Sequence, residues 1–178
     1  MKEIRKLKTE ELSRVSVKEF EQQHKNNFVL VLDNIRSMHN VGATFRTADS
    51  FAAERVYLCG ITAQPPHRDI HKTALGADKS VKWEYEKEIK NCIEKLKSIG
   101  YVVYVIEQTT NAASLATLSF DKDKKYAFVF GNEAFGISEE ILPLADGAIE
   151  IPQYGTKHSL NVSVCVGIIS WNYLAALS

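Results

Sequence analysis

The chain has 178 residues, of which 45% are hydrophobic and 25% charged, a balance typical of a single globular domain with a buried core. Lys and Arg together number 22, and so do Asp and Glu, so the formal net charge is zero. This neutrality excludes nucleic-acid binding driven by overall charge, so any such binding has to come from a local basic patch.

The chain begins with "MKEIRKLKTEELSR", which mixes both charges and lacks the apolar core of a signal peptide. No apolar run approaches the ~20 residues that a transmembrane helix needs. Cys59, Cys92 and Cys165 are scattered and form no CxxC motif. Thiols in this pattern favour a reducing compartment over a disulfide framework or a zinc cluster. We therefore expect a cytoplasmic protein that does not contact a membrane.

The chain divides into a polar N-terminal segment and a longer segment that contains the apolar runs. Residues 1–27 include "KTEELSRVSVKEFEQQHK", which is polar and predicts an N-terminal helical extension, with Leu12, Val15 and Phe20 as its contacts to the rest. Residues 28–178 are expected to form the domain proper, because the apolar runs begin there.

Short apolar runs alternate with helical patterns along the domain. The clearest helix is "EKEIKNCIEKLKSIG", where apolar residues recur at helical spacing and Gly100 stands in the position of a C-terminal cap. This alternation predicts an α/β domain with a mostly parallel sheet and flanking helices. Ligands of such sheets bind beyond the carboxyl ends of the strands. The predicted strands cover residues 28–32, 55–59, 101–106, 126–130 and 148–151.

The loop after the first strand leads into "NVGATFRTADS". We expect Asn40 to be the N-cap of a helix over roughly 41–52. Gly42 would leave open space one turn before Arg46, which suits a ribose-phosphate or another anionic group. The alternative is that Arg46 pairs with Asp49 on a solvated face and that Gly42 permits close helix packing. Taken alone, this stretch favours the alternative.

The loop after the fourth predicted strand reads "FVFGNEAFGIS". Gly131 and Gly136 permit backbone conformations and close approaches that other residues resist. Ser138 is expected to cap a short helix. Glu133 lies directly beyond the strand end, although a lone glutamate there is more often an exposed turn carboxylate. The chain contains neither GxGxxG nor a P-loop, so a dinucleotide or NTPase site is not supported.

The last predicted helix follows "YGTKHSLNVS". Ser159 is expected to cap it. Asn161 and Ser163 are less easily explained, because Asn and Ser have only a moderate helix propensity. We interpret Ser163 as structural. The helix is apolar nearly all round, which places it either deep in a core or between two subunits. A domain of this size has limited depth, so we favour a subunit interface.

Three stretches together resemble the three motifs of the SpoU/TrmH family of RNA 2′-O-ribose methyltransferases, in the SPOUT superfamily. They are "NVGATFRTA" (40–48), "FVFGNEAFGIS" (128–138) and "IEIPQYGTKHSLNVSVCVG" (149–167). Their order, spacing and strand–loop contexts all match, and the agreement runs from about Phe28 to the C-terminus. The resemblance implies a SPOUT-type fold with a C-terminal trefoil knot, although knots are rare in proteins. It also implies a homodimer whose active site lies by the subunit interface.

The resemblance further implies S-adenosylmethionine as cofactor, held in the knotted loops mainly by backbone groups. An apolar slot with main-chain hydrogen bonds is a common form of ligand pocket. The residues at the family's cofactor-binding positions are Ile106, Glu107, Phe130, Gly131, Asn132, Ile151, Ser159 and Leu160.

The residues at the family's catalytic positions are Arg46, Asn40, Glu133, Ser159 and Asn161. The family assigns activation of the 2′-hydroxyl to Arg46. A guanidinium has a pKa above ~12, so we favour phosphate anchoring and stabilisation of the developing alkoxide over general-base catalysis. The amides and the carboxylate would orient the arginine and the ribose. The reaction requires no metal.

A metal site at "HRDIH" is not favoured. His67 and His71 stand one helical turn apart there, but a third ligand and an HExxH motif are both missing.

Three rival functions remain: an inactive RNA-binding family member, a SPOUT methyltransferase acting on a base, and an unrelated α/β enzyme. The family positions are intact, and no other cofactor motif is present, so the rivals are weaker. For the substrate, "HKTALGADKSVKW" and "GYVVYVIEQT" resemble the branch that methylates the D-loop guanosine of tRNA, with rRNA as the alternative. The N-terminal extension is too short for a separate RNA-binding domain. Its basic residues would instead help to hold phosphates: Lys2, Arg5, Lys6 and Lys8.

Overall fold

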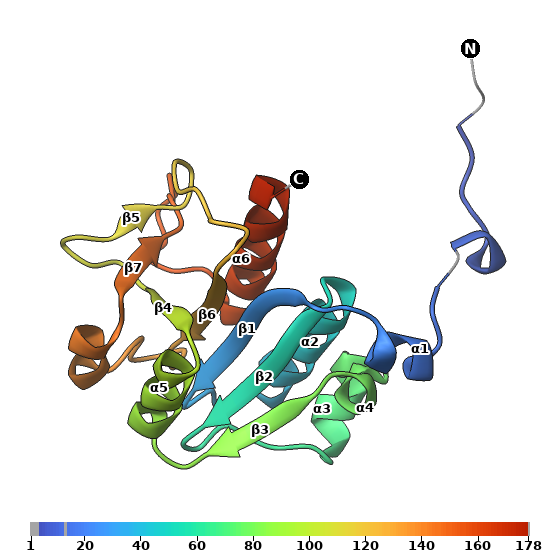
Figure 1. Cartoon of the computed structure of the whole chain (residues 1–178), viewed down its shortest axis with the longest axis horizontal. Coiled ribbons are helices and arrows are strands. Elements are labelled where there is room, and N and C mark those ends of the chain that lie inside the picture. The colour runs from blue at the N-terminus through green and yellow to red at the C-terminus, as the bar shows by residue number, and fades with distance from the viewer. Residues whose placement is uncertain (1–3, 13, 178) are drawn as a thin grey trace.

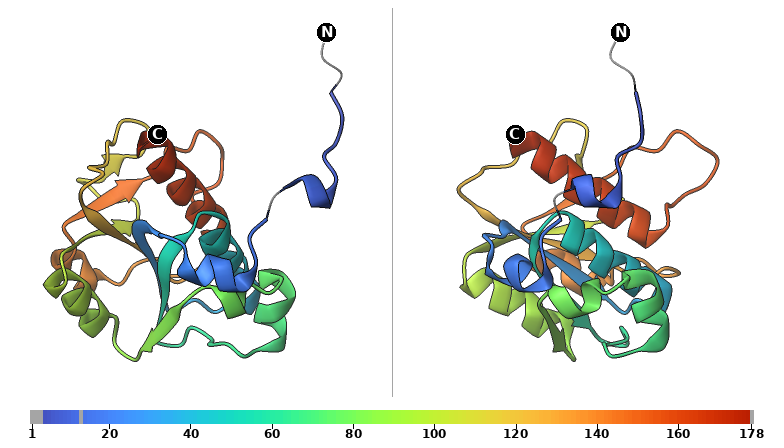
Figure 2. Two further views of the ribbon diagram at one scale, coloured as in Figure 1. Left: turned by 45° about the vertical axis from the view of Figure 1, so that its right-hand side comes forward. Right: turned by 90° about the vertical axis from the view of Figure 1, so that its right-hand side faces the viewer.

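A computed structural model describes residues 4–12 and 14–177 as a parallel sheet flanked by helices, with an N-terminal arm that extends away from the body (Figures 1 and 2). The predicted α/β class is confirmed. Lys2 lies outside the described residues. The passage of the C-terminal segment through an earlier loop stays a prediction.

The sheet has seven strands in the order β3-β2-β1-β6-β4-β7-β5, and every neighbouring pair is parallel. Each predicted strand is observed, with its ends shifted by at most a few residues. The strands are β1 (Asn26–Asp33), β2 (Ala53–Cys59), β3 (Trp83–Glu86), β4 (Tyr101–Ile106), β5 (Ala113–Ser114), β6 (Lys125–Phe130) and β7 (Gly147–Glu150).

Helices cover both faces of the sheet. They are α1 (Val17–Gln22), α2 (Met38–Ser50), α3 (Arg68–Ala74), α4 (Ala77–Ser80), α5 (Ile89–Ser98) and α6 (Val162–Leu177), with 3-10 helices η1 (Thr9–Leu12) and η2 (Glu139–Leu144). The elements that the patterns did not predict are short or lie at an edge: α3, α4, β3 and β5. Such segments carry too few residues for a period to be read from sequence.

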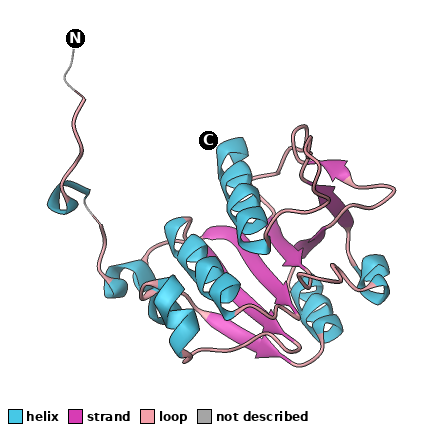
Figure 3. Ribbon diagram, turned by 180° about the vertical axis from the view of Figure 1, so that it is seen from behind, coloured by secondary structure: helices cyan, strands magenta, loops and turns pink. Residues whose placement is uncertain are grey.

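Alternate residues of each central strand face different helical layers, as the two-residue period of a strand requires. On β1, Phe28, Leu30 and Leu32 belong to the core beneath α2, α3, α4 and α6, the side seen in Figure 3. Val29 and Val31 belong to the core beneath α5 and η2 on the opposite side. Because both faces are covered, β1 is apolar over residues 28–32 and β6 over residues 126–130.

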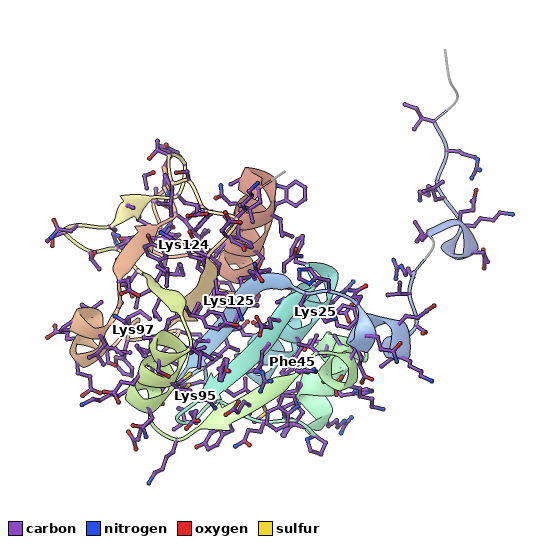
Figure 4. All side chains as sticks on the ribbon, viewed as in Figure 1. Lys25, Phe45, Lys95, Lys97, Lys124 and Lys125 are labelled. Atoms are coloured by element: carbon purple, nitrogen blue, oxygen red, sulfur yellow. The ribbon has the colours of Figure 1, made fainter. Side chains whose placement is uncertain are left out.

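Two lysines of α5, Lys95 and Lys97, are labelled in Figure 4, and both form ion pairs with residues in or next to the sheet. The Lys97 ammonium lies 2.8 Å from a carboxylate oxygen of Asp146, and Lys95 pairs with Glu84 on β3. Gly100 follows α5 with a φ of 88°, so the predicted C-terminal glycine is confirmed.

The N-terminal arm touches the domain mainly through one side chain. Ser16 and Glu19 form a reciprocal capping box at the start of α1. Phe20 is buried against the domain, as predicted, whereas Leu12 and Val15 are exposed, so these two expected contacts are wrong.

Two predicted helix caps are wrong. Ser37 caps α2, because its hydroxyl oxygen accepts the N–H of Asn40 at 3.3 Å. Helix α6 begins at Val162, too late for Ser159 to cap it. The side-chain oxygen of Asn161 accepts the N–H of Ser163 at 2.8 Å instead. Each predicted start was displaced by a few residues, because several capping residues stand close together in both loops.

The open space predicted beside Gly42 is also wrong. A methyl group on Gly42 would overlap the Thr73 hydroxyl and the Ile70 carbonyl oxygen of α3. Gly42 therefore allows α2 and α3 to pack closely, which is the alternative that the sequence left open. Within the described residues, no helix has both the length and the apolar character needed to cross a membrane.

Candidate functional site

The carboxyl ends of the central strands border a cavity of about 560 Å³, within the range typical of small-molecule sites. Its lining comes from the ends of β4, β6 and β7 and from the segment before α6, so stretches far apart in sequence meet there. All of the predicted cofactor residues line this first cavity: Ile106, Glu107, Phe130, Gly131, Asn132, Ile151, Ser159 and Leu160.

The loop after β6 doubles back on itself to shape one wall of the cavity. Asn132 and Gly136 exchange backbone hydrogen bonds of 3.0 and 2.8 Å. A methyl group on Gly131 would overlap the backbone of Gly136, and Gly136 has a φ of 68°. Both glycines are therefore required by the turn itself.

Glu107 fastens this loop to the end of β4. Its carboxylate oxygens accept the N–H of Gln108 at 2.9 Å and the N–H of Ile137 at 3.1 Å. The Gln108 amide in turn donates to the carbonyl of His158 at 3.0 Å, which ties in the segment before α6. Glu107 thus ties the end of β4 to the loop after β6 while it lines the cavity.

Glu133 stands at the rim and accepts three hydrogen bonds from the N-terminal end of α2. Its Oε2 accepts the N–H of Arg36 at 2.9 Å, and its Oε1 accepts the N–H of Ser37 and the side-chain amide of Asn40, both at 3.0 Å. Partial burial alone would raise the pKa of Glu133, but these donors outweigh it and bring the pKa below its usual value. The carboxylate is therefore ionised at neutral pH.

Asn40 joins Glu133 to the start of α6. It is buried, and its side-chain oxygen accepts the Asn161 amide at 3.2 Å. Because Ser37 caps α2, the side chain of Asn40 is free to make both bonds. The structure thus brings Asn40, Glu133 and Asn161 into one network, and Ser159 lies beside it on the cavity wall.

Arg46 is the one predicted catalytic residue that stands apart. It is exposed on α2, roughly 9 Å further along the helix axis than Asn40. Its side chain forms no ion pair with the described residues, and it does not line the first cavity. The predicted pairing with Asp49 is absent too, since that carboxylate accepts the Ser80 hydroxyl at 2.6 Å.

Sequence reasoning missed several residues of this site. Arg36 and Ser37 supply backbone N–H groups, Gln108 bridges two loops, and Glu150 lines the cavity. The available signal was their position, because each follows or ends a predicted strand. His67 and His71, which sequence did not favour as metal ligands, belong to no metal-binding group: among the described residues, His, Cys, Asp and Glu form no cluster of three or more that could hold an ion.

Comparison with known proteins identifies this arrangement. The SpoU rRNA methylase family matches residues 27–171. A tRNA (guanosine(18)-2′-O)-methyltransferase of Thermus thermophilus is 31% identical over 159 residues, which is 89% of this chain and 80% of that protein.

Solved structures agree with this match. A TrmH/SpoU tRNA modifying enzyme of A. aeolicus superposes with a TM-score of 0.79 at 26% identity, covering 90% of this chain and 80% of that one. An AdoMet-bound rRNA methyltransferase of Sinorhizobium meliloti has the same fold, with a TM-score of 0.79 at 24% identity over 89% of this chain and 60% of that one. The chain belongs to the SpoU rRNA methylase family.

Proposed function

We propose that this protein transfers the methyl group of S-adenosylmethionine to a ribose 2′-hydroxyl of RNA, with the D-loop guanosine of a tRNA as preferred target. One observation carries the proposal. The cavity lined by the predicted cofactor residues opens beside the network of Asn40, Glu133 and Asn161. A methyl donor in the cavity and a ribose hydroxyl at the network would meet at this junction. Such positioning alone lowers the activation barrier by several kcal/mol.

The chemistry of the cavity suits S-adenosylmethionine. Ile106, Ile151 and Leu160 supply apolar walls for a purine ring, and Glu150 adds a carboxylate that suits hydroxyl or ammonium donors. When bound, the cofactor supplies a methyl group activated by a sulfonium sulfur. The chain's part is to hold that group, to exclude water from it and to orient the ribose.

The residues at the rim divide the remaining tasks. The ionised Glu133 carboxylate fixes the loop before α2 and orients Asn40, while Asn161 extends the same network toward the ribose. Neither amide titrates near neutral pH, so they position rather than move a proton. Arg46 anchors phosphate and stabilises the alkoxide that forms at the 2′-oxygen. Its exposure leaves the guanidinium available to RNA.

The proposed assembly is a homodimer with the active site by the interface. On α6, Val164 is 48% exposed and Trp171 is 63% exposed. Large apolar side chains on one helix face favour burial against a second copy. Arg46 lies on α2, which packs against α6, so the same interface would adjoin it. A cytoplasmic location, expected from the cysteine pattern, stays a prediction.

The decisive experiment identifies the methylated nucleoside. Unmodified tRNA and rRNA are incubated with the purified protein and methyl-labelled S-adenosylmethionine, digested to nucleosides and analysed by mass spectrometry. We expect label in 2′-O-methylguanosine from tRNA, and none in tRNA that carries a 2′-deoxyguanosine at the target. Label on a base, or transfer to the 2′-deoxy substrate, would contradict the ribose assignment.

The second candidate substrate is rRNA, which the family's own name favours. Label in 2′-O-methylguanosine from rRNA alone would select it. Binding of RNA and cofactor without transfer to either RNA would select the inactive binding protein instead.

A further inference from the structure

A second cavity of about 460 Å³ lies on the other side of the loop after β6. Asn132, Phe135 and Gly136 line both cavities, so only this loop separates them. The remaining lining is partly polar and includes two opposite charges: Asp33, Asn34, Arg36, Ile61 and Ser138. Apart from the backbone N–H of Arg36, which donates to Glu133, none of these residues has a role in the proposed methyl transfer.

Asp33 ends β1 and is only 2% exposed. Its Oδ1 accepts the side-chain amide of Asn34 at 2.9 Å, and no described residue donates a hydrogen bond to its Oδ2. A carboxylate at this depth normally has its oxygens paired, because burying a charge without partners is costly. Oδ2 is not fully enclosed, because among the described residues only Asn172 has a buried side-chain atom without a partner. It therefore stays open to the second cavity, where a donor from outside the chain can reach it.

The position of this carboxylate is set by its neighbour. Asn34 has a φ of 54°, a conformation that non-glycine residues rarely adopt. Asn132 donates to its carbonyl at 2.7 Å, and its side-chain oxygen accepts the N–H of Ile61 at 3.1 Å. Several hydrogen bonds thus hold Asn34 in place, and Asn34 in turn holds the Asp33 carboxylate beside the cavity.

The ionisable neighbours of Asp33 are Glu140 from η2 and the Cys59 thiol on β2. Burial, and then Glu140, raise the pKa of Asp33 to about 6, so the carboxylate is mostly ionised at neutral pH. Arg36 lines the same cavity. Asp33 would repel an inorganic anion, and Arg36 would repel a metal cation. A neutral ligand that carries both hydrogen-bond donors and acceptors therefore fits this cavity better than either ion.

The second cavity is coupled to the reaction site. The backbone N–H of Arg36 donates to Glu133 at 2.9 Å, so the residue that lines the second cavity also holds the rim of the first. Phe135 is 85% exposed and Ile61 is 67% exposed at its mouth. Exposed apolar side chains around a polar floor suit a flat aromatic ring with a polar edge.

We propose that this second cavity binds the guanine of the nucleotide whose ribose is methylated. Asp33 accepts the N1–H and 2-amino donors of the base, Arg36 donates to O6, and Phe135 stacks on the ring. Among the RNA bases only guanine offers two adjacent donors beside an acceptor, whereas adenine presents the opposite order at N1 and N6. The inference rests on the proposed function and names the residues that select the base.

The test is a double-mutant cycle between protein and RNA. Two tRNA transcripts carry guanosine or 2-aminopurine at position 18, the position named for the Thermus relative. 2-Aminopurine keeps the amino group but lacks N1–H and O6. Wild type should lose roughly 5- to 150-fold in kcat/KM on the 2-aminopurine transcript, the size of one bidentate base contact. Asp33→Asn should lose a similar factor on guanosine and discriminate little between the transcripts.

Two controls separate base reading from general damage. Asp123→Asn removes one carboxylate charge from an exposed loop and should keep the wild-type ratio. The affinity of Asp33→Asn for S-adenosylhomocysteine, measured by calorimetry, should equal that of wild type, because Asp33 does not line the first cavity. Arg36→Met, at an exposed side chain, gives a second route to the same result if Asp33→Asn does not fold.

The outcomes of the two proposals are distinguishable. Wild type that methylates neither this transcript nor any other RNA overturns the proposed function. Wild type that methylates both transcripts equally, or an Asp33→Asn enzyme that is slowed with its ratio intact, overturns the base assignment alone. Loss of cofactor affinity in Asp33→Asn would overturn it as well.

Discussion

The two cavities differ most in how their carboxylates are paired. Glu133, at the rim of the first, accepts three hydrogen bonds from the chain itself, and its pKa lies below the usual value. Asp33, beside the second, accepts one hydrogen bond, and its pKa is raised to about 6. A carboxylate that the fold satisfies stabilises the fold. One that the fold leaves incompletely paired destabilises it and is available to a ligand.

Arg46 extends this comparison to a cation. Arg46 is exposed and has no ion-pair partner among the described residues, so it contributes little to the stability of the fold. We therefore expect its role to be ligand binding. Three substitutions test whether pairing separates framework residues from ligand-binding residues.

Arg46→Ala should have the largest effect. We expect methyl transfer to fall by about 1,000-fold or more, because charge stabilisation at the reacting oxygen is lost. The melting temperature and the affinity for S-adenosylhomocysteine should stay unchanged, since the side chain pairs with nothing in the chain. Tritium transfer, thermal unfolding and calorimetry measure the three quantities. Transfer at the wild-type rate would remove Arg46 from the mechanism, and Arg46→Lys serves as the charge-matched control.

Glu133→Gln should have an intermediate effect on both rate and stability. The amide cannot accept all three hydrogen bonds, so transfer should fall by roughly 100-fold and the free energy of unfolding by about 1 kcal/mol, a figure kept small because the loop is solvent-exposed. Denaturant unfolding at pH 7 measures the stability. The difference from wild type should vanish as pH falls through the lowered pKa of Glu133, since a carboxylate with a depressed pKa stabilises only above it.

Asp33→Asn should change the free energy of unfolding in the opposite direction from Glu133→Gln. A carboxyl whose pKa is raised on folding stabilises the fold below its unfolded value of 3.8, and this contribution is lost as pH rises through about 6. The variant should therefore exceed wild type in unfolding free energy by roughly 1–2 kcal/mol at pH 7.5, after allowance for the adjoining cavity. Near pH 4 the two should be equal.

Unfolding curves for Asp33→Asn and wild type at pH 4, 6 and 7.5 would measure this trend. Glu140, Arg36 and Cys59 are present in both proteins, so their own titration cancels in the difference. A variant that is less stable than wild type at pH 7.5 would mean that Asp33 is a framework residue like Glu133, and the comparison would fail.

Much of the fold was predictable from local pattern. Each buried strand carries a continuous apolar run, and α5 shows clear helical spacing, so type and order of the main elements followed from burial alone. Exact helix starts did not, because Ser37 and Asn40 compete for one cap, as do Ser159 and Asn161. The roles of Gly42 and Arg36 could not be predicted from the sequence either. Gly42 packs against α3, and Arg36 donates to Glu133, so each role depends on a segment distant in sequence.

The sequence by itself determined the α/β class, the family and the residues that line the first cavity, because these depend on periodicity and on short contiguous motifs. The tertiary structure decided which polar groups are paired. Glu133 meets Arg36 across 97 positions of sequence only because β1 and β6 lie side by side in the sheet. Burial and hydrogen bonding are properties of that packing, so only the packing could separate the satisfied carboxylate from the incompletely paired one.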